Sequence, residues 1–167
     1  VRTLNLNKNL IRLYAKIELA RRDFWQYCKL KAPDFYKEDR SFLHDFCNEL
    51  QSFVKSDDEV MVVNMPPRHG KSRTVGNFVE WILGNDQTQK IMTGSYNETL
   101  STTFSKGVRN TILEEKADEN KAVYSDVFPG VTIKRGDGAM NMWSLENGYN
   151  NYLATSPTGT ATGFGAT

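Results

Sequence analysis

The sequence lacks several features that would assign a protein to a special class. It holds only five prolines and two cysteines in 167 residues, and it has no repeats and no low-complexity linker. No apolar run approaches the roughly 20 residues of a membrane-spanning helix, and the first residues lack the apolar core of a signal peptide. Cys28 and Cys47 do not have the spacing of a metal site. We therefore expect a cytosolic protein whose two thiols are reduced and buried.

The charge balance is near neutral but uneven along the chain. Hydrophobic residues make up 39% and charged residues 25%, as in an ordinary globular domain, and the net charge is +1. Residues 1–32 carry eight basic and two acidic side chains, whereas residues 33–60 carry eight acidic and three basic ones. We interpret the basic stretch as a helix face exposed to solvent. The alternative interpretation is a surface that contacts nucleic acid or an acidic partner.

Apolar periodicity predicts two helices before the rest of the domain. Apolar side chains recur at helical spacing between Leu10 and Tyr27, which predicts one helix over residues 8–31. A second stripe predicts a helix over residues 39–54. We expect the two helices to form a helical N-terminal extension spanning residues 1–56.

The remaining residues, 57–167, alternate between strand and helix patterns, which predicts an α/β fold. Strands are expected at residues 59–64, 90–95, 131–134, 141–145 and 151–155, and helices at 70–84 and 97–115, with Asn97 as the cap of the latter. Turns are expected at 135–138 and at Asn147-Gly148, and a flexible Gly/Thr loop at 157–165. Trp25, Trp81 and Trp143 are expected in the core.

Between the first expected strand and its helix, residues 65–72 read Met-Pro-Pro-Arg-His-Gly-Lys-Ser. A strand, a tight loop with Gly-Lys-Ser and a helix are the context of a phosphate-binding loop. The first helical turn offers unpaired N–H groups and the positive end of the helix dipole to an anion. Gly70 lets the backbone close around a phosphate oxygen, Lys71 reaches the outer phosphates, and the Ser72 hydroxyl would ligate Mg²⁺. The pattern predicts a site for a nucleoside triphosphate.

The loop departs from the usual consensus at its first position. Met65 stands where that pattern has glycine, and Pro66 and Pro67 stiffen the entry. A chance Gly-Lys-Ser at a helix start is the alternative interpretation. For Arg68, contact with the γ-phosphate, action across a subunit interface and a solvated position all stay open. The predicted nucleotide-binding residues are Pro67, Arg68, His69, Gly70, Lys71, Ser72 and Arg73. Among them, Lys71 and Arg68 are the catalytic candidates, and Ser72 is the predicted Mg²⁺ ligand. His69 is expected to shape the loop.

Several segments together resemble the ATPase domain of the large terminase subunit of tailed bacteriophages. The resemblance rests first on Pro66-Pro67-Arg68-His69-Gly70-Lys71-Ser72, a form that the family's Walker A loop often takes. It extends to Phe42–Leu50, Gly94–Asn97, Val127–Gly130 with Trp143, and Thr158–Gly165, and covers roughly residues 36–167. It implies a three-layer P-loop NTPase sheet of the ASCE type, with residues 57–167 as a partial ATPase domain.

The resemblance implies an ATPase that uses ATP and Mg²⁺ to package double-stranded DNA in the bacterial host cytoplasm. Family members work as a homo-oligomeric ring on the portal protein, guided by a small terminase subunit, and carry a nuclease domain. No apolar run ending in an acidic Walker B residue is found, nor are the nuclease carboxylates. We therefore expect a fragment with little ATPase activity alone. A helicase-like P-loop ATPase and a non-catalytic prophage remnant that acts as an interaction module are the alternatives.

Overall fold

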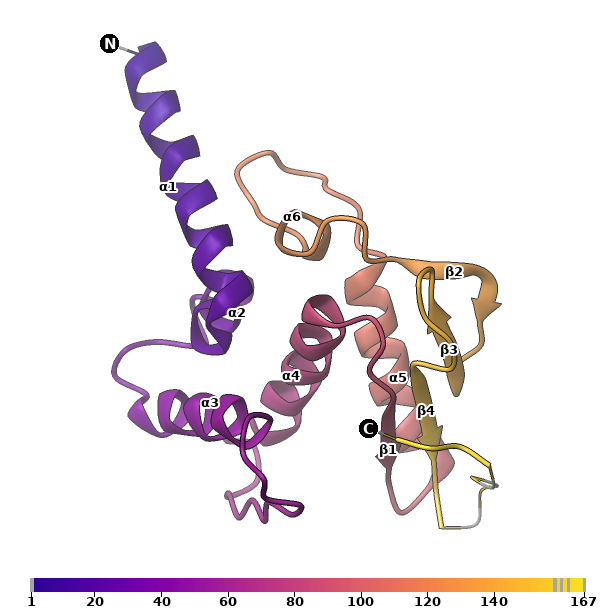
Figure 1. Cartoon of the computed structure of the whole chain (residues 1–167). Helices are drawn as coiled ribbons and strands as arrows, with labels where there is room; N and C mark the ends of the chain where they lie inside the picture. Colours follow the sequence, from indigo (N-terminus) through magenta and orange to yellow (C-terminus); the bar gives the residue numbers. More distant parts are fainter. Residues whose placement is uncertain (1, 158, 160, 162, 167) are drawn as a thin grey trace. The chain divides into compact units, whose positions relative to one another are not determined.

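The computed structural model describes residues 2–157, 159, 161 and 163–166, and it has an α/β architecture of helices and a mixed four-stranded sheet (Figure 1). The chain divides into two compact units, one with residues 1–78 and 116–122 and the other with residues 79–115 and 123–167. The expected Gly/Thr loop falls partly on residues 158, 160 and 162, which lie outside the described residues. Over the described ranges, no helix combines the length and apolarity needed to cross a membrane.

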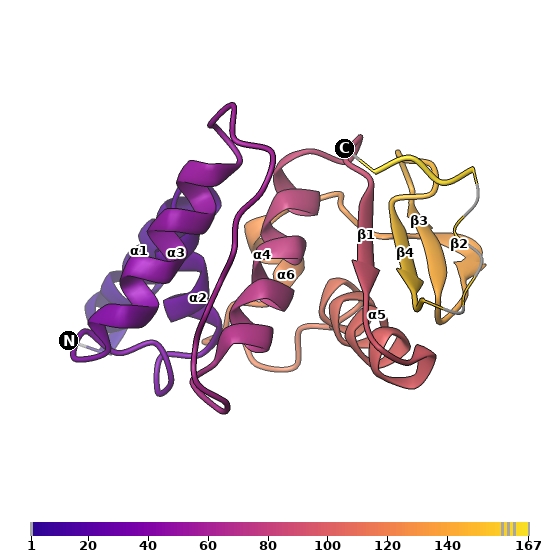
Figure 2. The same ribbon diagram turned by 90° about the horizontal axis from the view of Figure 1, so that it is seen from below.

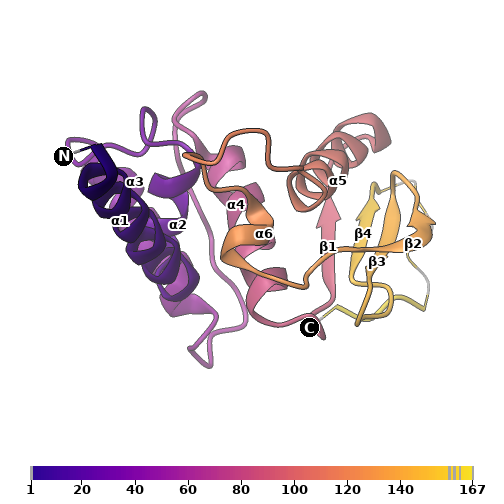
Figure 3. The same cartoon turned by 90° about the horizontal axis from the view of Figure 1, so that it is seen from above.

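The first unit is helical. It contains α1 (Arg2–Arg22), α2 (Phe24–Lys31), α3 (Ser41–Phe53) and the first half of α4 (Lys71–Asn85). Helix α2 contacts both α1 and α3, as Figure 3 shows for α1 and α2. The helix expected at residues 39–54 is thus confirmed as α3.

The expectation of one helix over residues 8–31 is wrong. Helix α1 ends at Arg22, and helix α2 begins at Phe24, directly after Asp23. This residue is extended, with φ −127° and ψ 120°, and its carboxylate accepts the N–H of Gln26 at 2.8 Å. The side chain thereby satisfies a donor that the first turn of a helix leaves unpaired, which is how an N-cap starts a new helix. Apolar periodicity continues across the break and hides it.

Aromatic and aliphatic side chains of α1, α2 and α3 form the core of this unit. Trp25 is buried, as expected, and packs edge-on against Tyr36. Cys28 and Cys47 are buried and free, with their Sγ atoms 3.9 Å apart, so the expectation of two buried, unpaired thiols is confirmed. Burial raises the pKa of the Cys28 thiol well above its usual value, and this thiol is therefore protonated at neutral pH.

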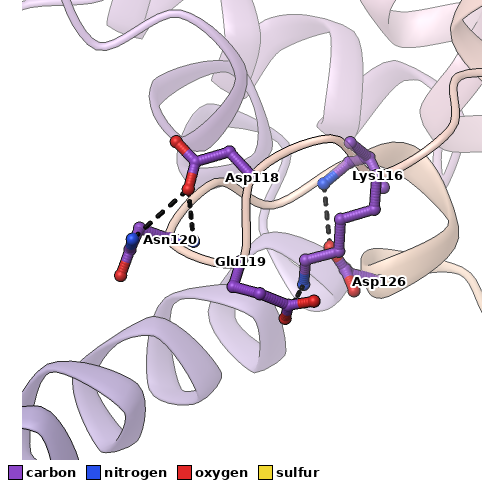
Figure 4. A network of polar contacts seen from close by, with 6 residues as sticks. Lys116, Asp118, Glu119, Asn120 and Asp126 are labelled. Carbon is purple, nitrogen blue, oxygen red and sulfur yellow. Dashed lines mark hydrogen bonds and ion pairs between the residues drawn. The ribbon is translucent and has the colours of Figure 1, made fainter.

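Residues 116–122 form a polar turn within the same unit (Figure 4). The Asp118 carboxylate accepts the backbone N–H of Asn120 at 2.9 Å and its side-chain amide at 3.3 Å, and Lys116 forms an ion pair with Glu119 at 3.9 Å. The backbone hydrogen bond from Asn120 holds the pKa of Asp118 below its usual value.

The second unit is built on a sheet with strand order β1-β4-β3-β2. Its strands are β1 (Ile91–Gly94), β2 (Ile133–Gly138), β3 (Met142–Leu145) and β4 (Tyr152–Thr155). Strands β1 and β4 are parallel, and the β4-β3 and β3-β2 pairs are antiparallel. Helix α5 (Glu98–Ile112) packs on β1 and β4 and contacts the short α6 (Tyr124–Val127) (Figure 2). Asn97 caps α5 as expected, accepting the N–H of Leu100 at 2.8 Å.

Two expectations are wrong: the strand at residues 59–64 and the turn at residues 135–138. Residues 59–64 form no strand, because the main chain of residues 60–66 makes no hydrogen bond to any residue that the structure describes, and a strand needs a partner. Residues 135–138, expected as a turn, belong to β2. Gly136 has φ +82°, and the pairing with β3 shifts register there, so this segment is an irregular strand rather than a turn.

The connection between β3 and β4 is fixed by one buried amide. Asn151 is fully buried, and its Oδ1 accepts the N–H of Leu145 at 2.8 Å. Its Nδ2 donates to the carbonyls of Gln87 at 2.6 Å and Gln89 at 2.9 Å. One side chain thus joins β3 to the segment that leads into β1.

We predict that Asn151→Ala lowers the free energy of unfolding by about 3 kcal/mol, because it removes three hydrogen bonds that a fully buried amide makes to the main chain. The measurement is urea denaturation followed by circular dichroism. Asn147→Ala, at an exposed position in the same connection, is the matched control and should stay within about 0.5 kcal/mol of the wild type. An equal effect of both substitutions would contradict the role of Asn151.

Candidate phosphate-binding loop

The loop that enters α4 has an unusual backbone. Arg68 has φ +64° and Gly70 has φ +90°, both in the left-handed region that side chains disfavour. The Nδ1–H of His69 donates to the Pro67 carbonyl at 2.9 Å, which closes the turn on itself. The Gly70 carbonyl accepts the N–H of Thr74 at 2.8 Å and thereby begins the helix. A left-handed non-glycine residue is costly, and such residues are frequent at ligand-binding turns.

Gly70 is required for a second reason besides its φ angle. A Cβ atom built on this residue would lie 2.7 Å from Cζ and 2.8 Å from Cε1 of Phe35. Leu43 of α3 lies close behind, with its Cδ2 at 3.4 Å from the same point. The loop therefore lies directly against Phe35, and any side chain at position 70 would force that ring to move.

The Phe35 ring also holds two guanidinium groups. Arg40 lies 4.8 Å and Arg73 lies 4.7 Å from the ring centroid, within the range of cation–π attraction. Arg73 belongs to the first turn of α4, and Arg40 directly precedes α3. A single aromatic ring thus gathers positive charge around Gly70.

A buried polar network joins the start of α4 to the first unit. Thr74 is fully buried, and its hydroxyl pairs with the Tyr36 hydroxyl at 3.0 Å. The Asn77 amide donates to the same Tyr36 oxygen at 3.0 Å and to Cys28 Sγ at 3.7 Å. Burial raises the pKa of Tyr36, so its hydroxyl keeps its proton and remains part of the network. The direction of the helix is therefore set from inside the first unit.

The first residues of α4 present donors that have no partner among the described residues. Across the described chain, no residue accepts the N–H of Lys71, Ser72 or Arg73. Lys71 is exposed and takes part in no ion pair with any described carboxylate. An exposed cation next to free helix N–H groups is an arrangement suited to a phosphate chain.

An open groove of about 500 Å³ borders the loop. Apolar side chains of α3 and of residues 61–66 form most of its wall, and Glu49, Asn64 and His69 supply polar groups. His69 belongs to both the loop and the groove, and its ring lies 5.9 Å from that of Phe42. The groove therefore reaches the loop at His69, one residue before Gly70.

Of the sequence-predicted residues, the structure places Pro67 to Gly70 in the turn and Lys71 to Arg73 in the first turn of α4, and it brings Phe35 and Arg40 beside them. No motif marks Phe35 in the sequence, and its role is visible only from its distance to Gly70.

In the second unit, Ser95 lines a separate cleft at the carboxyl ends of β1 and β4. Trp143 and Trp81 are core residues, as expected. Within the described part of the chain, no cluster of three His, Cys, Asp or Glu side chains is arranged to hold a metal.

We predict that Gly70→Ala lowers the free energy of unfolding by about 2 kcal/mol, because it combines a left-handed φ with a clash against Phe35. Gly76→Ala is a matched control in the same helix, where an added Cβ meets nothing within 4 Å. It should be neutral or stabilising by up to about 1 kcal/mol. Chemical denaturation measures both, and a Gly70→Ala variant as stable as Gly76→Ala would contradict the close approach.

Comparisons with known proteins complete the description of this site. No family model matches the chain, and neither the curated proteins nor the solved structures give a match. A function for the loop is therefore inferred from the chemistry of its own residues.

Proposed function

We propose that residues 67–73 bind the triphosphate of ATP together with Mg²⁺, and that the chain is the ATPase part of a phage or prophage DNA-packaging motor. The observation that carries the nucleotide proposal is the first turn of α4. The N–H groups of Lys71, Ser72 and Arg73 and the Lys71 ammonium have no partner among the described residues, while Gly70 and Thr74 anchor the turn. Donors that are fixed and unpaired before binding cost little to organise around an anion.

The roles of the side chains follow from their positions in the turn. Lys71 would neutralise the outer phosphates, and Arg68 would add a forked contact to a phosphate oxygen. The Ser72 hydroxyl would ligate Mg²⁺, which when bound neutralises charge on the phosphate oxygens. Arg73 is held against Phe35 and would contribute long-range positive charge rather than a direct contact.

The groove beside the loop supports a nucleotide over inorganic phosphate. Its apolar wall, with side chains such as Phe42 and Met65, suits the flat faces of a base. Glu49 and Asn64 offer an acceptor and a donor to the edge of that base. Because His69 borders both parts, a base in the groove and phosphates at α4 would belong to one ligand.

The DNA-packaging part of the proposal is supported by the sequence alone. The segment Pro-Pro-Arg-His-Gly-Lys-Ser and the order of the segments around it resemble the terminase large subunit. In this interpretation the motor's partners are double-stranded DNA, a portal protein, a small terminase subunit and further copies of the chain.

The test is calorimetric titration of the purified chain with ATP and Mg²⁺. We predict micromolar binding, weakened by about tenfold or more in Lys71→Ala, because the main phosphate cation is lost. Lys55→Ala, an exposed lysine of the same unit, is the matched control and should bind as the wild type does. Circular dichroism confirms that all three proteins are folded. Equal affinity of Lys71→Ala and the wild type would contradict the proposed site.

A further inference from the structure

Two guanidinium groups from separate segments lie on one aromatic ring of the first unit. The Cζ atom of Arg40 is 4.8 Å and that of Arg73 is 4.7 Å from the centroid of Phe35. All three residues belong to the first unit, so their arrangement does not depend on where the second unit lies. Side chains of equal charge repel each other, and an anion that lies close to both of them lowers this repulsion.

The carboxylates nearest in sequence do not neutralise these two arginines. Glu38 forms its ion pair with Lys29 instead. Asp34, next to Phe35, and Asp39, next to Arg40, form no ion pair with either guanidinium. The link between α2 and α3 thus carries acidic groups, and yet the positive charge on the ring is left to an external anion.

The positive charge here exceeds what one nucleotide requires. A triphosphate with its Mg²⁺ carries about two negative charges, which Lys71 and Arg68 together balance. Residues 60–79 contain no acidic side chain, so the charges of Arg40 and Arg73 are additional. This count rests on the proposed nucleotide, whereas the position of the two arginines on their ring does not. The surplus favours a second anion beside the first.

The guanidinium group also selects the chemistry of that anion. Each guanidinium is a planar fork of N–H donors that matches the oxygens of a carboxylate or a phosphate. A carboxylate is fully engaged by one fork, whereas a phosphate group presents more acceptor oxygens and can accept from two forks. Contact with Phe35 restricts both side chains before binding, so less side-chain entropy is lost when the anion arrives.

We propose that Arg40 and Arg73 form a second anion site, separate from the triphosphate site, that binds a phosphate group. Free phosphate and the backbone of nucleic acid both present this chemistry. The site uses Arg40 from the link before α3, and it does not require Lys71. It can therefore be tested in a chain whose loop has lost its main phosphate cation.

Thermal denaturation in rising inorganic phosphate tests the site without ATP. The chain carries Lys71→Ala throughout, and sodium chloride of equal ionic strength is the reference. An anion that binds only the folded chain raises the midpoint temperature, and we expect a phosphate-specific rise of about 3 °C at tens of millimolar. Adding Arg40→Gln should remove most of this rise. Adding Lys37→Gln, an exposed cation of the same link, changes the net charge equally and should keep it. Each rise is measured within one variant, so differences in basal stability do not affect the comparison.

Binding of a short DNA duplex, measured by fluorescence anisotropy over a salt series, distinguishes the two sources of phosphate. If the backbone occupies the site, Arg40→Gln should reduce the slope of log affinity against log salt by about 1, and Lys37→Gln should not. Equal slopes, with the phosphate-specific rise still lost in Arg40→Gln, assign the site to free phosphate.

Two results would overturn the second site: a midpoint rise no larger in phosphate than in chloride, or an equal rise in Arg40→Gln and Lys37→Gln. A phosphate-specific rise that depends on Arg40, in a chain that binds no ATP by calorimetry, would reject the nucleotide site and leave this one standing.

Discussion

The contact between Gly70 and Phe35 is the constraint on which the candidate site depends. The backbone turns through a left-handed φ at the point where a Cβ would overlap the ring, so any residue other than glycine is strained there. The same ring attracts Arg40 and Arg73, and neither of these arginines forms an ion pair with a carboxylate that the structure describes. One aromatic side chain from the link between α2 and α3 thus sets both the path of the loop and the charge around it.

The rigidity of the turn and the openness of its donors have a common cause. The side chains of Thr74 and Asn77 form hydrogen bonds with Tyr36 and Cys28 inside the first unit. The N–H groups of Lys71, Ser72 and Arg73 have no acceptor among the described residues. Buried polar groups whose hydrogen bonds are all made hold a site rigid. Exposed helix N–H groups without acceptors favour an anionic ligand.

Local patterns predicted much of this structure, and the errors have physical reasons. The helices at α3 and α5, the cap at Asn97 and the buried tryptophans follow from periodicity and side-chain chemistry close in sequence. The break at Asp23 was missed because apolar spacing continues through it, and the bulge at Gly136 because Gly-rich segments also form turns. The unpaired segment at 59–64 reads as a strand from composition, whereas pairing depends on residues far away. Phe35 could not be found, since its importance is a distance across 35 positions of chain.

The most direct test of the account is to observe the turn itself while a nucleotide is added. In an amide ¹H–¹⁵N spectrum of the ¹⁵N-labelled chain, titration with ATP and Mg²⁺ should shift the amide signals of Gly70, Lys71 and Ser72 first and most strongly. Signals of the groove residues Asn64 and Glu49 should follow with the same dissociation constant. Unchanged amide signals from Gly70 to Ser72 at saturating nucleotide would contradict the claim that this turn binds a triphosphate.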